Sequence, residues 1–173
     1  MSTFELQIWD DETEKVTFYS PRMEDSDYSE MDKFLLRIEK LPEMEGALQE
    51  LLELVREVIG NNHGATKAIF NRFENNFIAL PPKGSVKIGE IEFHYKGFPL
   101  RLYCLPLNEE AVILFNGGIK NADTVQESDD IISTKFYEAN EFTKKILKAI
   151  YARDIIVTGR TITDYNGNTE IYL

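Results

Sequence analysis

Apolar and polar residues alternate at the start of the chain. Phe4 to Trp9 follows this period of two, an acidic stretch interrupts it, and Val16 to Tyr19 is again rich in β-branched and aromatic residues. Alternation of this kind is typical of a strand with one buried face. The pattern therefore predicts an N-terminal β-hairpin. The acidic connection, residues 10–14, lacks the spacing and central glycine of a calcium-binding loop, so we interpret it as a solvated turn.

The spacing of the apolar residues then changes to that of two helices. Ser29-Glu-Met-Asp32 has the pattern of a helix N-cap and predicts a helix that runs to about Lys40. Pro42 ends this helix, and in the next segment apolar residues recur every three or four positions as far as Ile59. Gly60 to Asn62 are expected to stop the second helix. We expect the two helices to pack as an antiparallel pair.

The middle of the chain has the pattern of β-structure. Residues 68–73 and 77–80 have β character on either side of a polar turn. Val86 to Tyr95 alternates, and Gly89 is interpreted as a β-bulge where the alternation changes phase. Lys96 and Gly97 are expected to form a two-residue hairpin connection into the next strand.

The strand after that connection covers Phe98 to Leu105, and a wholly apolar run follows at Ala111 to Phe115. A continuous apolar run is typical of a strand buried on both faces. These segments together predict a three-stranded antiparallel meander with residues 111–115 at its buried centre.

The last fifty residues predict a loop, a helix and a closing hairpin. The loop covers residues 121–130, and Ser133 is expected to cap a helix that runs to Ile150, with Glu141 paired to a lysine four positions on, Lys145. Asp164 to Asn168 is a strong turn signal between apolar segments. We expect these segments, 155–163 and 170–173, to pair as the hairpin.

These elements predict an α+β fold in a single domain. An antiparallel β-sheet, a meander, would pack against an N-terminal helical pair and a C-terminal helix, with flanking β-hairpins. The length of 173 residues and the hydrophobic content of 43% suit one compact domain with a real core. Residues 1–42 would form the first hairpin and helix, residues 43–150 the core, and residues 151–173 the closing hairpin.

The net charge of −11 is concentrated in the first third of the chain. Residues 1–60 hold 16 acidic and 6 basic side chains, whereas residues 61–173 hold 14 and 13. The acidic part includes the outer face of the second predicted helix, which is either a solubilising surface or a docking surface for a basic partner. A balance near zero in the rest of the chain leaves room for a local anion site but forms no basic patch. Glutamates of the predicted outer face are Glu43, Glu45, Glu50, Glu53 and Glu57.

Several functional classes find no support in the sequence. Cys104 is the single cysteine, so no intramolecular disulfide forms, and we expect a cytoplasmic protein with no membrane partner because neither a leader nor an apolar span is present. With His63 and His94 as the two histidines, a structural zinc site would need carboxylate ligands. Hydrolase and nucleotide-binding glycine motifs are absent. We therefore expect no metal and no cofactor, and no feature indicates an oligomeric state.

The strongest candidate chemistry lies on the strand over residues 98–105. Alternation places Arg101 and Tyr103 on one face and Leu100, Leu102 and Cys104 on the other. A guanidinium in a mainly apolar setting requires an anion. Two alternatives satisfy it: a carboxylate such as Glu92 on the neighbouring strand, or a phosphate group of a ligand whose charge the arginine stabilises during backbone cleavage.

Three further residues complete the candidate site. Lys120 follows Gly117 and Gly118 at the exit of the next strand and would converge on Arg101. His94 or Tyr103 would supply a proton-transfer group within the sheet. Each of these three side chains also suits a surface or packing role. The candidate catalytic set is therefore Arg101, Lys120, His94 and Tyr103.

In these residues the chain resembles the RelE/ParE/HigB superfamily of bacterial toxin–antitoxin toxins. Arg101-Leu-Tyr103 is similar to the arginine strand of that family, Val112 to Phe115 to its central apolar strand, and Gly118-Ile-Lys120 to its glycine-to-lysine segment. The similarity covers roughly residues 43–150. It implies an α+β toxin scaffold, with the chain being longer and more acidic than is usual in the family.

The resemblance implies a metal-independent mRNA endoribonuclease, with an antitoxin protein and RNA or the ribosome as partners. ParE-like members inhibit DNA gyrase instead, so the resemblance bears on the fold more than on the target. The alternative function is a non-enzymatic protein-interaction module on a RelE-like scaffold, using the acidic helices or a sheet edge.

Overall fold

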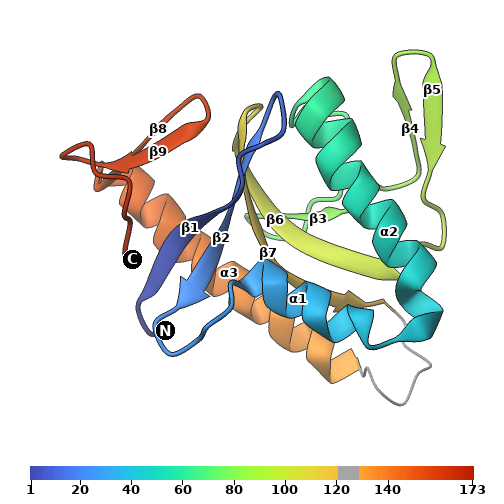
Figure 1. Ribbon diagram of the computed structural model, residues 1–173, viewed down its shortest axis with the longest axis horizontal. Helices are drawn as coiled ribbons and strands as arrows, with labels where there is room; N and C mark the ends of the chain where they lie inside the picture. Colours follow the sequence, from blue (N-terminus) through green and yellow to red (C-terminus); the bar gives the residue numbers. More distant parts are fainter. Residues whose placement is uncertain (121–128) are drawn as a thin grey trace.

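A computed structural model describes residues 1–120 and 129–173 and has the predicted α+β class (Figure 1). A five-stranded sheet lies between two helical layers, and two small hairpins flank it. In chain order the elements are β1 (Phe4–Asp10), β2 (Thr17–Met23), α1 (Glu30–Glu39), a 3₁₀ turn (Pro42–Met44), α2 (Glu45–Glu53) with its π-helical continuation (Leu54–His63), β3 (Ile78–Leu80), β4 (Ser85–Ile88), β5 (Ile91–His94), β6 (Leu100–Asn108), β7 (Ala111–Ile119), α3 (Asp129–Tyr151), β8 (Ile155–Thr158) and β9 (Thr161–Asp164).

The central sheet has the strand order β1-β2-β7-β6-β3. Every residue of β7 is buried, as the apolar run predicted. All neighbouring strands are antiparallel except β2 and β7, which run parallel, so the expectation of a purely antiparallel sheet is wrong at this pair. The reason is topological: α1, α2 and the segments after them separate the N-terminal hairpin from β7, and a long crossover permits parallel pairing.

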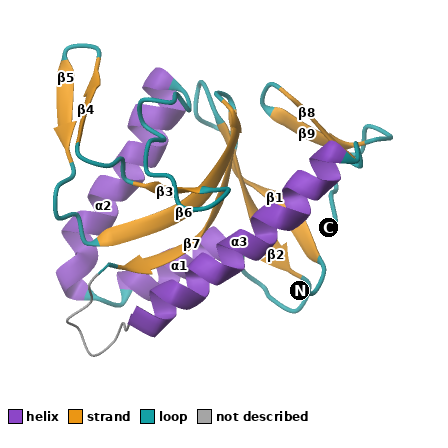
Figure 2. Ribbon diagram, turned by 180° about the vertical axis from the view of Figure 1, so that it is seen from behind, coloured by secondary structure: helices purple, strands orange, loops and turns teal. Residues whose placement is uncertain are grey.

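The two faces of the sheet are covered by different helices. Phe18, Leu102 and Leu114 pack in one core cluster with the apolar side chains of α1 and α2. Phe4 and Phe115 belong to a second cluster with α3. Figure 2 shows α3 crossing the sheet on the side opposite to α1 and α2. Alternate residues of each strand therefore serve different cores, as the period of two requires.

The helices on the first face begin as predicted but are arranged differently. The Ser29 hydroxyl accepts a hydrogen bond from the Asp32 backbone N–H at 3.2 Å, which confirms the N-cap of α1. Figure 1 shows α2 rising away from the end of α1, so the two helices do not form the expected antiparallel pair. The turn at Pro42–Met44 redirects the chain between them.

Gly60 does not stop the second helix, which continues as a π-helix to His63 and ends at Gly64, with φ +76°. A Cβ atom at Gly60 would lie 2.7 Å from Cγ2 of Thr13. The glycine therefore allows the helix to pack closely against the turn between β1 and β2. Gly60 is required for this contact and does not mark the end of the helix.

The predicted three-stranded meander is wrong in its first strand. Residues 85–94 form a separate two-stranded sheet, β4–β5, in which Ser85 is paired with His94. Gly89, with φ +62°, lies in the turn of this hairpin and is not a bulge. Lys96 and Gly97 then lead into β6 without pairing it to β5, since Tyr95 and Phe98 turn inward to the core. The strand that pairs with β6 on the side away from β7 is β3, where residues 86–95 were expected.

The C-terminal part also departs from the expected pairing. The β8–β9 hairpin turns at Gly159 and Arg160, whereas the last residues return to β1: the Phe4 N–H donates to the Leu173 carbonyl at 2.9 Å. In α3, Ser133 lies inside the helix, which begins before it. The predicted loop over 121–130 falls outside the described residues up to 128.

The predicted ion pair in α3 is also wrong. Glu141 is paired with Lys144 at 3.1 Å, three positions on. Lys145 instead donates to the Met1 carbonyl at 3.2 Å.

The closest backbone approach in the sheet occurs at Gly117 of β7. A Cβ atom there would overlap the carbonyl oxygen of Arg101, whereas one at Gly46 in α2 would meet nothing within 4 Å. We expect Gly117→Ala to lower the free energy of unfolding by about 3 kcal/mol, since the strands must separate to admit the methyl group. The matched control Gly46→Ala is expected to raise it by about 0.5 kcal/mol. Urea denaturation measures both; an unchanged stability of Gly117→Ala would contradict so close an approach of β6 to β7.

Candidate functional site

A hollow of about 350 Å³ opens beside α3, at one end of β6 and β7. Three of the four residues proposed from the sequence, Arg101, Tyr103 and Lys120, line this hollow together, and His94 does not. We call it the cationic hollow. Its lining consists of Arg72, Glu74, Arg101, Tyr103, Lys120, Ile132, Ser133 and Phe136.

Strand geometry brings the three predicted residues together. Arg101 and Tyr103 lie two positions apart on β6 and face α3, while Leu100 and Leu102 face the other core, as the alternation predicted. Lys120 directly follows β7, and its backbone N–H donates to the Pro99 carbonyl at 2.7 Å. This bond fixes the start of the Lys120 side chain beside β6.

Arg101 is half-buried and has no carboxylate partner among the described residues. Its Nη1 donates to the carbonyls of Phe98, at 2.8 Å, and Leu100, at 2.9 Å. The ion pair with Glu92 is wrong, because Glu92 lies on β5 in the separate hairpin, 4.0 Å from Nε2 of His94. The two carbonyls hold the guanidinium in place, and no carboxylate of the described residues forms a close ion pair with it.

The surroundings of Arg101 disfavour its charge. Burial lowers the pKa of Arg101, the charge of Arg72 lowers that pKa further, and Glu74 opposes these two effects. A guanidinium remains charged at neutral pH even so. The side chain is therefore a charged group that is only partly hydrated and lies near a second cation, Arg72.

Arg72 and Glu74 come from a segment that runs outside the short edge strand β3. The Ala79 N–H donates to the Arg72 carbonyl at 3.0 Å, which holds the segment against β3. The guanidinium of Arg72 donates to the carbonyls of Pro81, at 3.0 Å, and Pro82, at 3.3 Å. The sequence pattern did not indicate these two residues, because they are distant in the chain from β6 and their segment has no regular periodicity.

The position of Glu74 is fixed by its neighbours. Its backbone N–H donates to the Phe77 carbonyl at 3.0 Å, and Asn75 donates through Nδ2 to Oδ1 of Asn140 on α3 at 2.9 Å. These contacts hold the segment in place, and the Glu74 side chain lines the same hollow as Lys120 and Arg101. With three cationic side chains and one carboxylate, the lining is positively charged on balance.

Tyr103 forms the inner wall of the hollow. Its ring contacts Phe77 and Phe136 edge-on, with centroid separations of 5.5 Å and 5.8 Å. Burial, and after it the charge of Glu74, raises the pKa of Tyr103 to about 12. Among the described residues its hydroxyl has no hydrogen-bond partner. The phenol is therefore neutral at physiological pH and able to donate a hydrogen bond to a ligand.

His94 lies outside the central sheet, so its proposed place beside Arg101 is wrong. It is exposed on β5, where Nδ1 lies 2.7 Å from the Ser85 hydroxyl. The misplacement follows from the hairpin expected at Lys96 and Gly97, because β5 pairs with β4 and not with β6.

No group of three metal-ligating side chains occurs in the part of the chain that the structure describes. None of the helices within residues 1–120 and 129–173 is sufficiently long and apolar to cross a bilayer. Comparison with protein families, with curated proteins and with solved structures finds no match for this chain. The resemblance to the RelE/ParE/HigB superfamily consequently stays a prediction.

The buried phenol of Tyr103 predicts a loss of stability in alkali. Because its pKa is raised from 10.0 to about 12, the folded protein holds the proton more tightly than the unfolded chain. This contribution to stability is complete below pH 10 and is lost as the pH rises toward 12. We expect Tyr103→Phe to lose less unfolding free energy than the native protein between pH 9 and pH 11.5.

Urea denaturation at both pH values tests this expectation. Burial also raises the pKa of Tyr95 to about 12, so Tyr95→Phe is a matched comparison. It should reduce the alkaline loss of unfolding free energy by a similar amount, and the double substitution should reduce it by the sum of the two amounts. An identical alkaline loss in native protein and Tyr103→Phe would show that the phenol is not held neutral by its site.

Proposed function

We propose that the cationic hollow binds a phosphate group of RNA and that the protein is a metal-independent endoribonuclease, the toxin component of a bacterial toxin–antitoxin system. The observation that carries the proposal is the half-buried guanidinium of Arg101, which has no carboxylate partner among the described residues and shares its hollow with Arg72 and Lys120. Paired guanidinium groups match the oxygens of a phosphate. A preorganised positive charge of this kind stabilises a phosphorane-like transition state more than the ground state.

RNA supplies its own nucleophile, the ribose 2′-hydroxyl, so cleavage requires proton transfers and charge stabilisation and no metal ion. In the proposed reaction Glu74 accepts the proton of the ribose 2′-hydroxyl while the 2′-oxygen attacks the phosphorus. The P–O5′ bond breaks, and the leaving 5′-oxygen takes the proton of Tyr103. The products are a 2′,3′-cyclic phosphate and a 5′-hydroxyl, and transfer of a proton from Glu74 to Tyr103 through water restores the site.

Each assignment follows from the position and the charge of the group. Glu74 lines the hollow and is exposed to solvent, as a base that meets the incoming ribose must be. Tyr103 is buried and neutral, which suits a proton donor. Arg72 and Arg101 would contact the non-bridging oxygens, and Lys120 would neutralise the charge that remains on the neighbouring phosphate.

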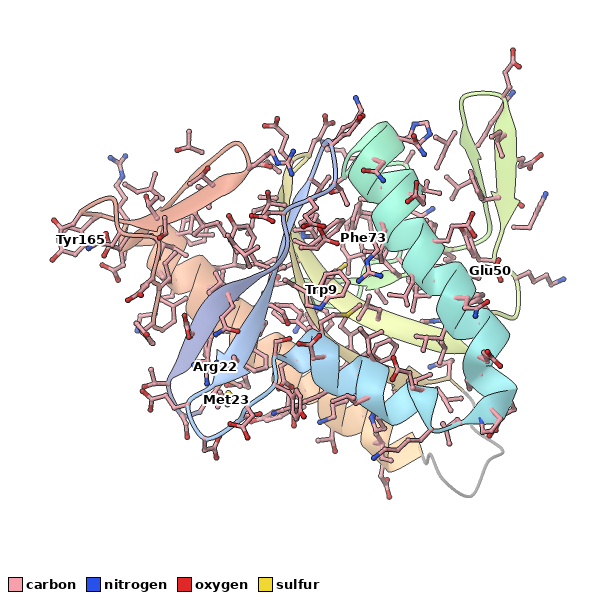
Figure 3. All side chains as sticks on the ribbon, in the orientation of Figure 1. Trp9, Arg22, Met23, Glu50, Phe73 and Tyr165 are labelled. Carbon is pink, nitrogen blue, oxygen red and sulfur yellow. The ribbon has the colours of Figure 1, made fainter. Side chains whose placement is uncertain are left out.

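The acidity of the chain does not oppose this proposal. The acidic side chains of α2 and its continuation are exposed on the first face of the sheet, whereas the cationic hollow lies on the α3 face. Figure 3 shows Glu50 on the outer side of α2. The hollow and these glutamates therefore lie on opposite faces of the sheet, and at physiological salt charges beyond about 8 Å are largely screened.

The second candidate is a non-enzymatic interaction module, and the exposed acidic face of α2 favours it. A group of unpaired glutamates on α2 and on the turn before it suits a basic partner protein. Among the described residues Glu43, Glu45, Glu50 and Glu53 have no ion-pair partner, and all four are exposed. An antitoxin would fit either candidate function.

The test is RNA cleavage by the purified protein in the presence of EDTA, with a single-stranded RNA as the substrate. We expect Arg101→Ala to lower the cleavage rate at least 100-fold, about the effect of removing one transition-state donor. Lys87→Ala removes an exposed lysine from the β4–β5 hairpin and should leave the rate unchanged. Circular dichroism of each variant checks that it folds.

The same variants distinguish the two candidates in bacteria. Expression of the native protein should arrest growth with loss of intact mRNA, and Arg101→Ala should relieve both effects. Cleavage that is equal in native protein and Arg101→Ala contradicts the assignment of the site. No cleavage by the native protein, together with tight binding of a basic protein that is lost when the α2 glutamates are changed to glutamine, would instead support the interaction module.

A further inference from the structure

Phe73 is an exposed aromatic residue at the rim of the sheet, 75% exposed. It stands between Arg72 and Glu74, both of which line the cationic hollow. A bridge pairs Phe73 with Ile78 at the start of β3, so its ring lies on the side of the rim opposite to those two side chains. Consecutive residues of one short segment therefore reach both sides of the sheet edge.

The ring of Phe73 borders a second hollow, of about 500 Å³, which we call the apolar hollow. Its lining is mostly apolar and includes Phe70, Phe73, Ile78, Pro106 and Leu107. β3 covers only the first part of β6, up to Cys104, and the apolar hollow lies beside the rest of that strand. The backbone N–H of Ala65 donates to the Glu109 carbonyl at 2.8 Å and holds the far wall in place.

A single exposed aromatic residue on a protein surface needs no functional explanation. Phe73 differs because its two neighbours in the chain carry the charges of the cationic hollow and because a preformed apolar space lies beside its ring. Nucleic acids combine the same two chemistries, a charged phosphate and a flat apolar base, in each successive nucleotide of one chain.

We infer that a nucleobase of the bound RNA stacks on Phe73 at the mouth of the apolar hollow, while a neighbouring phosphate occupies the cationic hollow. This inference rests on the proposed function and specifies its substrate class: a single-stranded RNA whose backbone crosses the rim of the sheet. A base within a duplex is already stacked and paired, so a duplex cannot fill this site. Stacking on a phenylalanine face tolerates every base, so the site selects single strands and not a sequence.

The test compares two short fluorescent strands of equal length and charge by anisotropy. One is a 2′-O-methyl oligouridylate, which lacks the free 2′-hydroxyl and is not cleaved by the proposed route, and the other is its abasic counterpart. The native protein is expected to bind the strand with bases about 10-fold more tightly than the abasic strand. Phe73→Ala should abolish this preference and leave binding of the abasic strand unchanged, and Phe73→Trp should restore it.

Two controls separate this inference from the proposed function. Tyr165→Ala removes another exposed aromatic ring, 71% exposed and far from the rim, and should bind both strands as the native protein does (Figure 3). Arg101→Ala should weaken the binding of both strands equally. Equal affinity of the native protein for the two strands, or a preference that persists in Phe73→Ala, overturns the base site while the phosphate site stands. Failure of the native protein to bind either strand overturns both.

Discussion

The pairing of β6 with the buried strand β7 is the interaction on which the site depends. Because every residue of β7 is buried, the strand has a fixed position between the two cores, and the register with β6 places Arg101 opposite Gly118. A glycine there presents no side chain beside Arg101, and Gly117 allows the Arg101 carbonyl to approach closely. Gly117 therefore permits the close pairing of the two strands that carry Arg101 and Lys120 to the cationic hollow.

The charges of the hollow follow from how that space is enclosed. β6 carries Arg101 into a half-buried position where carbonyl groups fix its orientation, and the segment outside β3 adds Arg72. Burial and the neighbouring charge of Arg72 disfavour the charged form of Arg101 and lower its pKa, and Glu74 opposes these two effects. In the function that we propose, a bound phosphate would supply the negative charge that offsets this cost, and perturbed charges of this kind are common at functional sites.

Much of the scaffold could be predicted from residue patterns, and the failures have physical causes. Alternation along residues 98–105 correctly separated the two faces of β6, and the apolar run of β7 correctly marked the centre of the sheet. Gly60 and Gly89 were misinterpreted because a glycine signals a close contact, a turn or a helix end with equal strength. Parallel pairing of β2 with β7 is a long-range event that no local pattern encodes.

The site itself was predictable only where it lies on regular strands. Two of the predicted residues, Arg101 and Tyr103, lie on β6, and Lys120 directly follows β7, the strand paired with it. Arg72 and Glu74 instead reach the hollow from an irregular segment that tertiary contacts hold in place. The same segment explains why a cationic hollow and an apolar hollow lie on the two sides of the rim. Its charged side chains face α3 and its aromatic ring faces the other way, as in a strand, although it pairs with β3 only through a single bridge.

The central claim is that Arg101 and Arg72 form one anion site, and NMR of the arginine side chains tests it most directly. A titration with a nucleoside 3′-phosphate would follow the Nε–H resonances of these two residues, with Arg153, outside the hollow, as an internal reference. Both resonances are expected to shift together along one saturating curve while that of Arg153 stays still. Resonances of Arg72 and Arg101 that do not move at saturating ligand, or move no more than that of Arg153, would contradict the claim.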